Sequence, residues 1–481
     1  MAAVGAAALM TGAVAQAAET LTGALVKTYG GNPTIMAQRA QLRSLDEGVA
    51  VARAQGRPQL SGTAGVNQDL YQIGGGGGRN ISASVDVSYP LFNGGRVRNS
   101  IRAADDRVLA GRASLKATEG DIFTEAVGAY MDVIRDRSIV TLNQNQVRVL
   151  QTNLQASRDR FEVGDLTRTD VAQSEARLAL AQSALATAEG RLSGSEENYR
   201  RVIGELPDEL TPPPPLPPLP STPDEAVEIA LANNSDLVSI AAQARAAGRD
   251  VAVARADRLP TVSGVGGSDA TNYLGTATDQ FGPEARNQVF QSRVGVQARI
   301  PIYQGGLVGA RVRQSQAIQS QLLERGVETE RLVVANTRAA FSSYQAAVEA
   351  IESNQIAVNA NTLALEGTRA EQTVGTRNVL DVLNAEQELL NSQVALVTAR
   401  RDAYVAGFAL LNAMGKAEAE DINLDGGALY DPVDHYRRTR KRASDWNDDS
   451  TPQAVSTRTV AGTSPSPIAG PPNTPVTPPS N

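Results

Sequence analysis

The chain of 481 residues contains no cysteine, which excludes a disulfide framework, a thiolate metal site and a lipid anchor on an N-terminal Cys. Aromatic residues make up only 4 %, too few for large globular cores. Ala, Gln, Leu, Val, Glu and Arg dominate instead, as in long helices packed on each other. The net charge is −7 with Lys and Arg dispersed, so we expect no nucleic-acid partner.

Long apolar runs are also missing. Residues 2–18 are small and apolar and contain Ala15-Gln16-Ala17, a pattern typical of signal-peptide cleavage. We therefore expect residues 1–17 to be a secretory signal peptide; the alternative is an Ala-rich leader without structure. No run of 18 apolar residues occurs elsewhere, which argues against a transmembrane helix.

Residues for enzyme chemistry are scarce. The only histidine, His435, lies near the C-terminus and is interpreted as solvated. Gly305, Gly306 and Gly309 follow a strand pattern, as in a dinucleotide-binding loop, but Gln304 replaces the first glycine of that motif. We interpret this stretch as a strand-to-helix joint and expect no enzyme activity, no cofactor and no metal.

What the chain does contain is a long repeat. Tyr89-Pro90-Leu91-Phe92-Asn93-Gly94-Gly95 returns as Ile300-Pro301-Ile302-Tyr303-Gln304-Gly305-Gly306, a shift of 211 residues. The same shift relates Val163-Gly164 to Val374-Gly375, Asp170-Val171 to Asp381-Val382, and Gly204 to Gly415. Upstream, Pro58 returns as Pro260, a shift of 202, so one surface loop before residue 89 or its counterpart varies in length. The unit is too long for a solenoid and indicates two structural halves.

Proline spacing predicts the helices. Pro33 and Pro58 bracket a helix over about 33–55. No proline occurs between Pro90 and Pro207, so residues 96–161 are expected to form one helix of roughly 100 Å, followed by a second over 169–202. Heptad spacing supports a coiled-coil hairpin in each half. The heptad positions are Val171, Leu178, Leu185 and Leu192, then Val382, Leu389, Leu396 and Ala403, with Ser174, Ala181, Ala188, Ala385, Ser392 and Ala399 between them.

Two strands are expected on either side of the glycine run 74–78, which reads as a hairpin tip. Apolar and polar residues alternate over 81–91 and again over 290–302. Such alternation is typical of a membrane β-strand between lipid and a lumen, and equally of a half-buried strand in a soluble sandwich. The strands alone leave both interpretations open.

The expected organisation has five parts: residues 1–17 signal peptide, 18–205 first repeat, 206–223 Pro-rich linker, 224–420 second repeat, and 421–481 disordered tail. The linker contains Pro212 to Pro215 and is expected to be stiff and extended. The tail is rich in Pro, Ser and Thr and carries a basic cluster over 437–442, interpreted as a solvated run.

Order, repeat and motifs together resemble the TolC family of outer-membrane exit ducts, over about residues 20–420. The most similar stretches are residues 300–308 and Val374-Gly375-Thr376-Arg377-Asn378-Val379-Leu380-Asp381-Val382-Leu383. The resemblance implies a mixed α+β membrane protein whose trimer forms a 12-stranded β-barrel continued by a 12-helix coiled-coil tunnel across the periplasm. The strand count agrees with it, because four strands in one chain cannot close a barrel and oligomerisation removes their edges.

The implied function is passive exit across periplasm and outer membrane for tripartite efflux pumps and type I protein secretion. The implied partners are outer-membrane lipid, a periplasmic adaptor (membrane fusion) protein and an inner-membrane transporter of RND or ABC type. Three alternatives stay open. A free-standing porin does not need long coiled coils, an adaptor carries one hairpin per chain, and a soluble periplasmic coiled-coil scaffold needs no lipid-facing strands.

The resemblance also implies a gate at the hairpin tips, formed by Thr169, Asp170 and Arg377. Arg377 has no equivalent in the first half, where Leu166 stands, and we expect it to pair with Asp170 and hold the tunnel closed. Gln372 replaces a tyrosine of the family network, which weakens the expected latch. The alternative is an exposed pair that contributes little.

Two further groups follow from the resemblance. Asp381, repeated in a trimer, forms an acidic ring that favours cations, while Asn384 stands where the family has a second acidic ring. We therefore expect weaker block by multivalent cations. The tips expected to contact the adaptor are Val163, Gly164, Asp165, Val374, Gly375 and Thr376.

Overall fold

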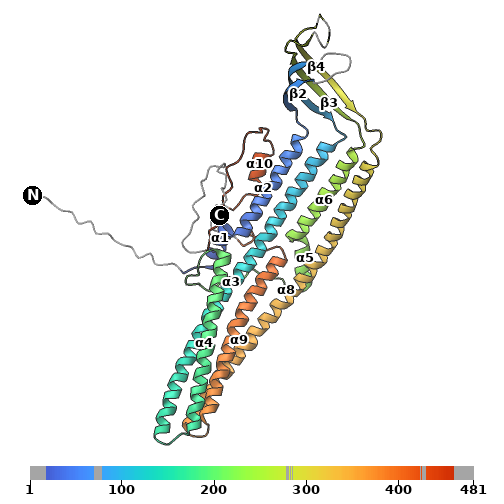
Figure 1. The fold of residues 1–481 in the computed structure, drawn as a ribbon. Coiled ribbons are helices and arrows are strands. Elements are labelled where there is room, and N and C mark those ends of the chain that lie inside the picture. The colour runs from blue at the N-terminus through green and yellow to red at the C-terminus, as the bar shows by residue number, and fades with distance from the viewer. Residues whose placement is uncertain are drawn as a thin grey trace, which may run out of the picture.

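The computed structural model describes residues 18–69, 78–277, 285–422 and 429–459, together with residues 281, 283 and 424. A small sheet caps one end of a long helical body, and the tips of two helical hairpins form the other end (Figure 1). The expected signal peptide and most of the glycine run 74–78 lie outside the described residues.

The elements repeat as the sequence does. The first half contains α1 (Leu21–Gly31), α2 (Pro33–Ala54), β1 (Gln59–Gln68), β2 (Arg79–Phe92), α3 (Arg96–Glu162) and α4 (Arg168–Ile203). The second half contains α5 (Pro223–Asn233), α6 (Ser235–Ala256), β3 (Thr261–Asn272), β4 (Gln288–Arg299), α8 (Leu307–Thr373) and α9 (Val379–Ala413), and α10 (Asp434–Thr439) follows. The bounds of α5 and α6 match those of α1 and α2 at the shift of 202, and α8 matches α3 at 211.

The long helices are confirmed with bounds within one residue of those expected, but α1 and α5 were not expected. Each short helix ends at an asparagine, Asn32 or Asn234, whose side chain caps the helix that follows. The same asparagines also donate to the C-terminal end of the hairpin, to the carbonyl oxygens of Val202 at 2.9 Å and Ala413 at 3.2 Å. Each asparagine side chain thus both accepts and donates hydrogen bonds, and together these bonds fix the junction between the short helix and the hairpin.

Small heptad residues bring the hairpin helices together. Ser174, Ala181 and Ala188 are buried between α3 and α4, while the leucines between them are partly exposed. The hydroxyls of Ser157 and Ser174 lie 3.2 Å apart across this contact. The expectation that small residues permit close helix approach is confirmed.

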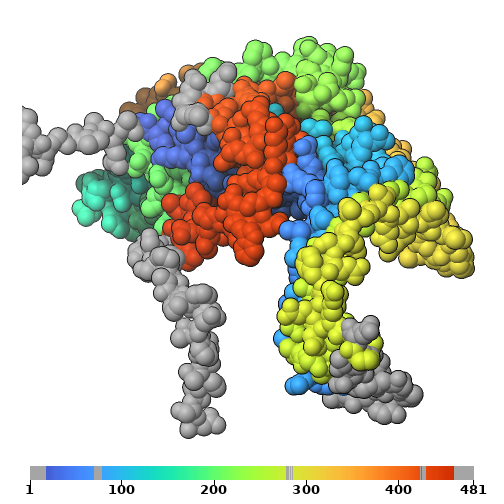
Figure 2. Space-filling view, turned by 90° about the horizontal axis from the view of Figure 1, so that it is seen from above, coloured from blue at the N-terminus to red at the C-terminus, as the bar shows by residue number. Residues whose placement is uncertain are grey.

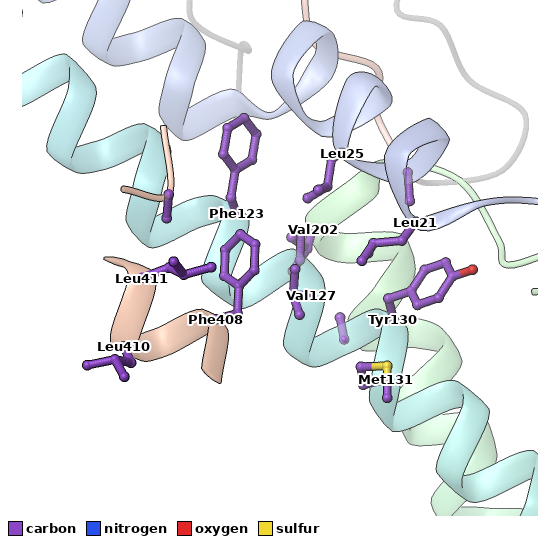
Figure 3. Close-up of a cluster of buried hydrophobic side chains, with 14 of the residues drawn as sticks. Leu21, Leu25, Phe123, Val127, Tyr130, Met131, Val202, Phe408, Leu410 and Leu411 are labelled. Atoms are coloured by element: carbon purple, nitrogen blue, oxygen red, sulfur yellow. The ribbon is translucent and has the colours of Figure 1, made fainter. Parts of the chain in front are cut away.

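The main apolar cluster lies midway along the body, where α1 packs against α3 and α4 and where α9 packs against α3 (Figure 3). Its largest buried side chains include Phe123, Tyr130 and Tyr199. The Tyr130 hydroxyl lies 2.6 Å from the carbonyl oxygen of Thr211 and 2.9 Å from that of Glu19. The Pro-rich linker is thereby held against the start of the described chain.

The sheet is antiparallel throughout, in the order β1-β2-β3-β4. Its central pair, β2 with β3, joins the two halves of the chain. Within the described residues, β1 and β4 each pair on one side only. Among the described helices, none has an apolar stretch long enough to cross a bilayer.

The segment after residue 429 differs from the expected disordered tail. Tyr430 and Tyr436 pack against the buried cluster between α2 and α3, and α10 lies beside α2 (Figure 1). The interpretation of His435 as solvated is wrong, because its side chain is 13 % exposed and contacts Asp46. The segment is mostly polar, but its few aromatic side chains bury enough apolar surface to hold it against the helices. Residues 460–481 lie outside the described part.

Candidate functional site

The two hairpin tips have the same backbone conformation. Each helix ends at a glycine in the left-handed region, Gly164 and Gly375, both with φ of 83°. The next residue, Asp165 or Thr376, donates its N–H back to the carbonyl oxygen of Arg160 or Glu371 at 2.8 and 3.0 Å. This is the turn that only glycine adopts without strain, and it closes the last turn of the helix.

The carboxylates predicted to act at the gate cap the helices that follow. Asp170 forms a capping box with Thr167, whose backbone N–H and hydroxyl donate to Asp170 Oδ2 at 2.9 and 2.7 Å. Asp381 forms the matching box with Asn378. Hydrogen bonds from the Thr167 side chain and backbone hold the pKa of Asp170 below its usual value, so this carboxylate stays ionised near neutral pH.

Arg377 is exposed and is held by its own hairpin. Its Nε donates to Glu371 Oε2 at 2.8 Å, and its Nη1 lies 4.0 Å from Asp381 Oδ2. The bond to Glu371 raises the pKa of the Arg377 guanidinium. Within the described chain Arg377 forms no ion pair with Asp170, so the structure does not bring the two predicted latch residues together in one copy. Thr169 lies exposed on the first turn of α4.

The first tip carries its charges in the reverse order around the turn. Arg160, the counterpart of Glu371, binds Asp165 through two nitrogens at 2.6 and 2.8 Å. The first tip therefore presents an arginine before the turn and a carboxylate after it. The second tip presents a carboxylate before the turn and Arg377 after it.

A pair of inter-helix bridges was missed from the sequence. Arg158 binds Glu175 at 2.7 Å between α3 and α4, and Arg369 binds Glu386 at 2.8 Å between α8 and α9. The two bridges are related by the same shift of 211, which is the signal that reveals them. Inspection of turns and heptads alone does not select these positions.

The two hairpins also contact each other. Asn153 of α3 donates to both oxygens of Glu386 at 3.1 and 3.2 Å. Arg177 of α4 donates to Asn384 Oδ1 at 2.6 Å. A positive charge therefore lies beside the position where the resemblance implied a second acidic ring, now occupied by Asn384.

The sheet presents two chemically distinct faces. Large apolar side chains on β2, β4 and the segment that follows β4 are exposed, with Val294 at 93 % and Ile302 at 95 %. On the other face Arg293 binds Asp269 at 2.6 Å and Asp86 at 2.7 Å. It reaches Asp86 across Gly267, where a Cβ would lie 2.6 Å from the Asp86 carboxylate. Arg293, Asp86 and Asp269 on this face are thus paired, while large apolar groups on the other face are uncovered.

The sequence matches the family described as outer membrane efflux protein over residues 24–205 and 226–416, which leaves out the whole Pro-rich linker and the tail. It is 35 % identical over 452 residues to the outer membrane efflux protein BepC of Brucella suis biovar 1, covering 91 % of this chain and 95 % of that protein. It is 24 % identical over 354 residues to the alkaline protease secretion protein AprF of Pseudomonas aeruginosa, covering 71 % of each.

The fold is that of a solved channel. The CmeC outer membrane channel of Campylobacter jejuni aligns with a TM-score of 0.74 at 15 % identity, covering 88 % of this chain and 89 % of the channel. The sequence match spans both repeats, and the fold match includes most of each chain. This chain therefore belongs to the outer membrane efflux protein family.

Proposed function

We propose that three copies of the chain assemble edge to edge, closing a barrel of twelve strands in the outer membrane and a tunnel of twelve helices across the periplasm. The observation that carries this proposal is the sheet with two open edges, β1 and β4, within the described residues. Unpaired backbone groups in lipid cost several kcal/mol each, and joining β1 of one copy to β4 of the next satisfies them.

The two faces of the sheet fix its orientation in this assembly. The apolar face with Val294 and Ile302 faces lipid, and the face with Arg293, Asp86 and Asp269 faces the lumen. The reverse orientation places an ion triad in hydrocarbon. It also leaves the large apolar side chains in water.

The assembled duct is passive. It gives exit to cargo delivered by an inner-membrane transporter, of RND or ABC type, through a periplasmic adaptor that binds the hairpin tips. The sequence contains no nucleotide-binding motif, so the energy comes from that partner. One relative is named for efflux and another for secretion of a protease, and both kinds of cargo fit a channel of this fold.

The tips form the gate. Arg377 and Asp170 are not partners within one chain, so the latch joins Arg377 of one copy to Asp170 of the next and occurs three times around the axis. To form it, Arg377 exchanges Glu371 for Asp170, a carboxylate already ionised and fixed in place by Thr167. Because the pair occurs three times around the axis, the small free energy of one exposed ion pair counts three times in the closed state.

Planar-bilayer conductance of the detergent-extracted trimer tests both duct and latch. We expect a low conductance in the wild type that rises in Arg377→Ala and in Asp170→Asn, which removes charge while keeping an acceptor for Thr167. Arg160→Ala breaks the matched ion pair of the first tip and is the control with unchanged conductance.

Glu371→Gln distinguishes the proposed latch from a general disturbance of the hairpin tip. It releases Arg377 from its partner in the same hairpin, so the closed state should persist or tighten. A conductance that rises in Glu371→Gln as much as in Arg377→Ala would contradict the latch but not the duct. Absence of any channel would contradict the duct and favour a soluble scaffold, and a large conductance unaffected by all four variants would favour an open porin.

The entrance selects cations through Asp381. Three such carboxylates near the axis raise the local cation concentration, while Arg177 beside Asn384 opposes a second ring. We expect Asp381→Asn to lower the cation-to-anion permeability ratio measured from the reversal potential, and Asp165→Asn to leave it unchanged. Tight block of the wild type by a trivalent cation would contradict the expected weakness of the site.

A further inference from the structure

The segment from residue 429 to 459 forms a strap over the helical body. Tyr430 donates its backbone N–H to the Tyr29 hydroxyl at 3.1 Å, and the Tyr436 hydroxyl donates to Asp105 at 2.9 Å. Arg39 lies between two rings of this contact, 4.2 Å from the centroid of Tyr29 and 4.9 Å from that of Tyr430. Seen from above, the strap covers part of the N-terminal helices (Figure 2).

The only histidine of the chain, His435, lies near the start of the strap. Its Nδ1 is 3.1 Å from Asp46 Oδ2, and its Nε2 is 3.8 Å from Glu47 Oε1. Asp46 is fully buried, and its second oxygen, Oδ1, has no hydrogen-bond partner among the described residues. A carboxylate beside Nδ1 favours the tautomer with the proton on that nitrogen, which makes Nε2, the nitrogen nearer Glu47, the one available to a metal ion.

Asp449 completes a set of three. One oxygen each from Glu47 and Asp449 and one ring nitrogen of His435 lie within 4.8 Å of one another. Tetrahedral Zn²⁺ with bonds of about 2.0–2.2 Å requires ligand atoms ~3.4 Å apart, so small side-chain movements suffice. The side chains of Glu47 and Asp449 are 41 % and 65 % exposed, which leaves them room for those movements.

We propose that Glu47, His435 and Asp449 bind one divalent transition-metal ion, with Zn²⁺ as the best match, and that this ion fastens the strap to α2. Imidazole and carboxylate are both Zn²⁺ ligands, and a set of three with a position left for water suits that ion and differs from the all-oxygen sites of Mg²⁺ and Ca²⁺. Asp46 acts as a positioning residue, since a carboxylate on the remote nitrogen orients a histidine ligand.

The ligands come from three separate segments, and this gives the ion a structural role. Glu47 lies on α2, His435 on α10, and Asp449 beyond α10. Binding to the folded strap and not to the released one stabilises the attached state in proportion to metal concentration. Arg442, which lies 3.0 Å from Asp449, loses that partner when the ion binds. The site is independent of the duct and its gate.

Zinc titration of the intact protein tests the proposal. The trimer in detergent is treated with chelator, dialysed, and titrated with ZnCl₂ against a zinc-binding dye. We expect one saturable Zn²⁺ per chain, an affinity at least about tenfold lower in Glu47→Gln and Asp449→Asn, and loss of binding in His435→Asn. Asp434→Asn, an exposed carboxylate of α10 paired with Arg438, is the matched control and should bind as the wild type does.

Trypsin cleavage within residues 437–442 gives a second readout of the same variants. Zn²⁺ should slow cleavage in the wild type and in Asp434→Asn but not in Glu47→Gln. Because Glu47 lies outside the strap, that variant does not disturb α10 itself. Absence of saturable binding in the wild type, or equal affinity in Glu47→Gln, Asp449→Asn and Asp434→Asn, would overturn the site.

Discussion

The first hairpin, α3 with α4, and the second, α8 with α9, have the same backbone conformation. They differ in how far charged residues at corresponding positions are buried. Glu175 is 50 % exposed, whereas its counterpart Glu386 is 3 % exposed and contacts α3 of the other hairpin. The difference extends to the tips, where Arg160 in one hairpin corresponds to Glu371 in the other. The two hairpins have the same turns and caps, while the contacts between them involve different side chains on each side. Matched substitutions in the two halves measure how far the chemistry has diverged.

The largest expected difference between the halves is in how Glu119 and its counterpart Glu330 affect the pH dependence of stability. Glu119 is buried and Glu330 exposed. Burial raises the pKa of Glu119 to about 7, with Arg39 and Lys116 opposing the shift and Glu418 and Glu420 adding to it. The folded state holds this proton more tightly than the unfolded state, so stability falls as pH rises from about 4.5 to about 7.

This shift corresponds to about 3 kcal/mol, which Glu119→Gln should recover above pH 7. Urea unfolding at pH 5 and pH 8 measures the effect, and Glu330→Gln should leave the pH dependence of the wild type intact. An unchanged pH dependence in Glu119→Gln would show that its burial carries no such cost.

The next difference is between the two inter-helix bridges. Glu386→Gln removes a buried charge bound by Arg369 and Asn153, and we expect a loss of about 2 kcal/mol in unfolding free energy. Glu175→Gln breaks an exposed bridge and should cost roughly 0–1 kcal/mol. Equal losses from the two variants would mean that contact between the hairpins adds nothing to the second bridge.

The smallest expected difference lies at the turns, where the halves should behave alike. Gly164→Ala and Gly375→Ala each place a side chain in the left-handed region and should each cost about 1–2 kcal/mol. The added methyl meets open space at both positions, so strain in the backbone is the only cause. Helical Gly190 is the control, where Ala should stabilise by about 0.5–1 kcal/mol; unequal losses at Gly164 and Gly375 would show that the tips differ in backbone as well.

The long helices could be predicted because α3 and α8 contain no proline and the heptads of α4 and α9 are regular. The two short helices α1 and α5 could not, since each has only 11 residues and its stability depends on packing against the hairpins. The strap was missed for a related reason. Its composition is that of a disordered tail, and its order comes from the packing of Tyr430 and Tyr436 against the buried cluster between α2 and α3.

At the tips, the helix caps could be predicted from the sequence, but the ion-pair partner of Arg377 could not. Thr167 and Asp170, or Asn378 and Asp381, stand three residues apart as capping boxes do. The partner of Arg377 depends on how the chain turns between residues 371 and 377, and spacing alone does not reveal it. The latch with Asp170 stays a prediction for the assembled trimer.

The central pair of the sheet has a consequence for the order of folding. β2 lies in the first half and β3 in the second, with α3 to α6 between them, and residues such as Val85 and Ser268 become neighbours across that distance. Closing so long a loop is slow compared with forming a helical hairpin from adjacent segments. The helical halves can therefore fold first, and β2 pairs with β3 only after both halves of the chain are present. Until then their protection from aggregation must come from outside the chain.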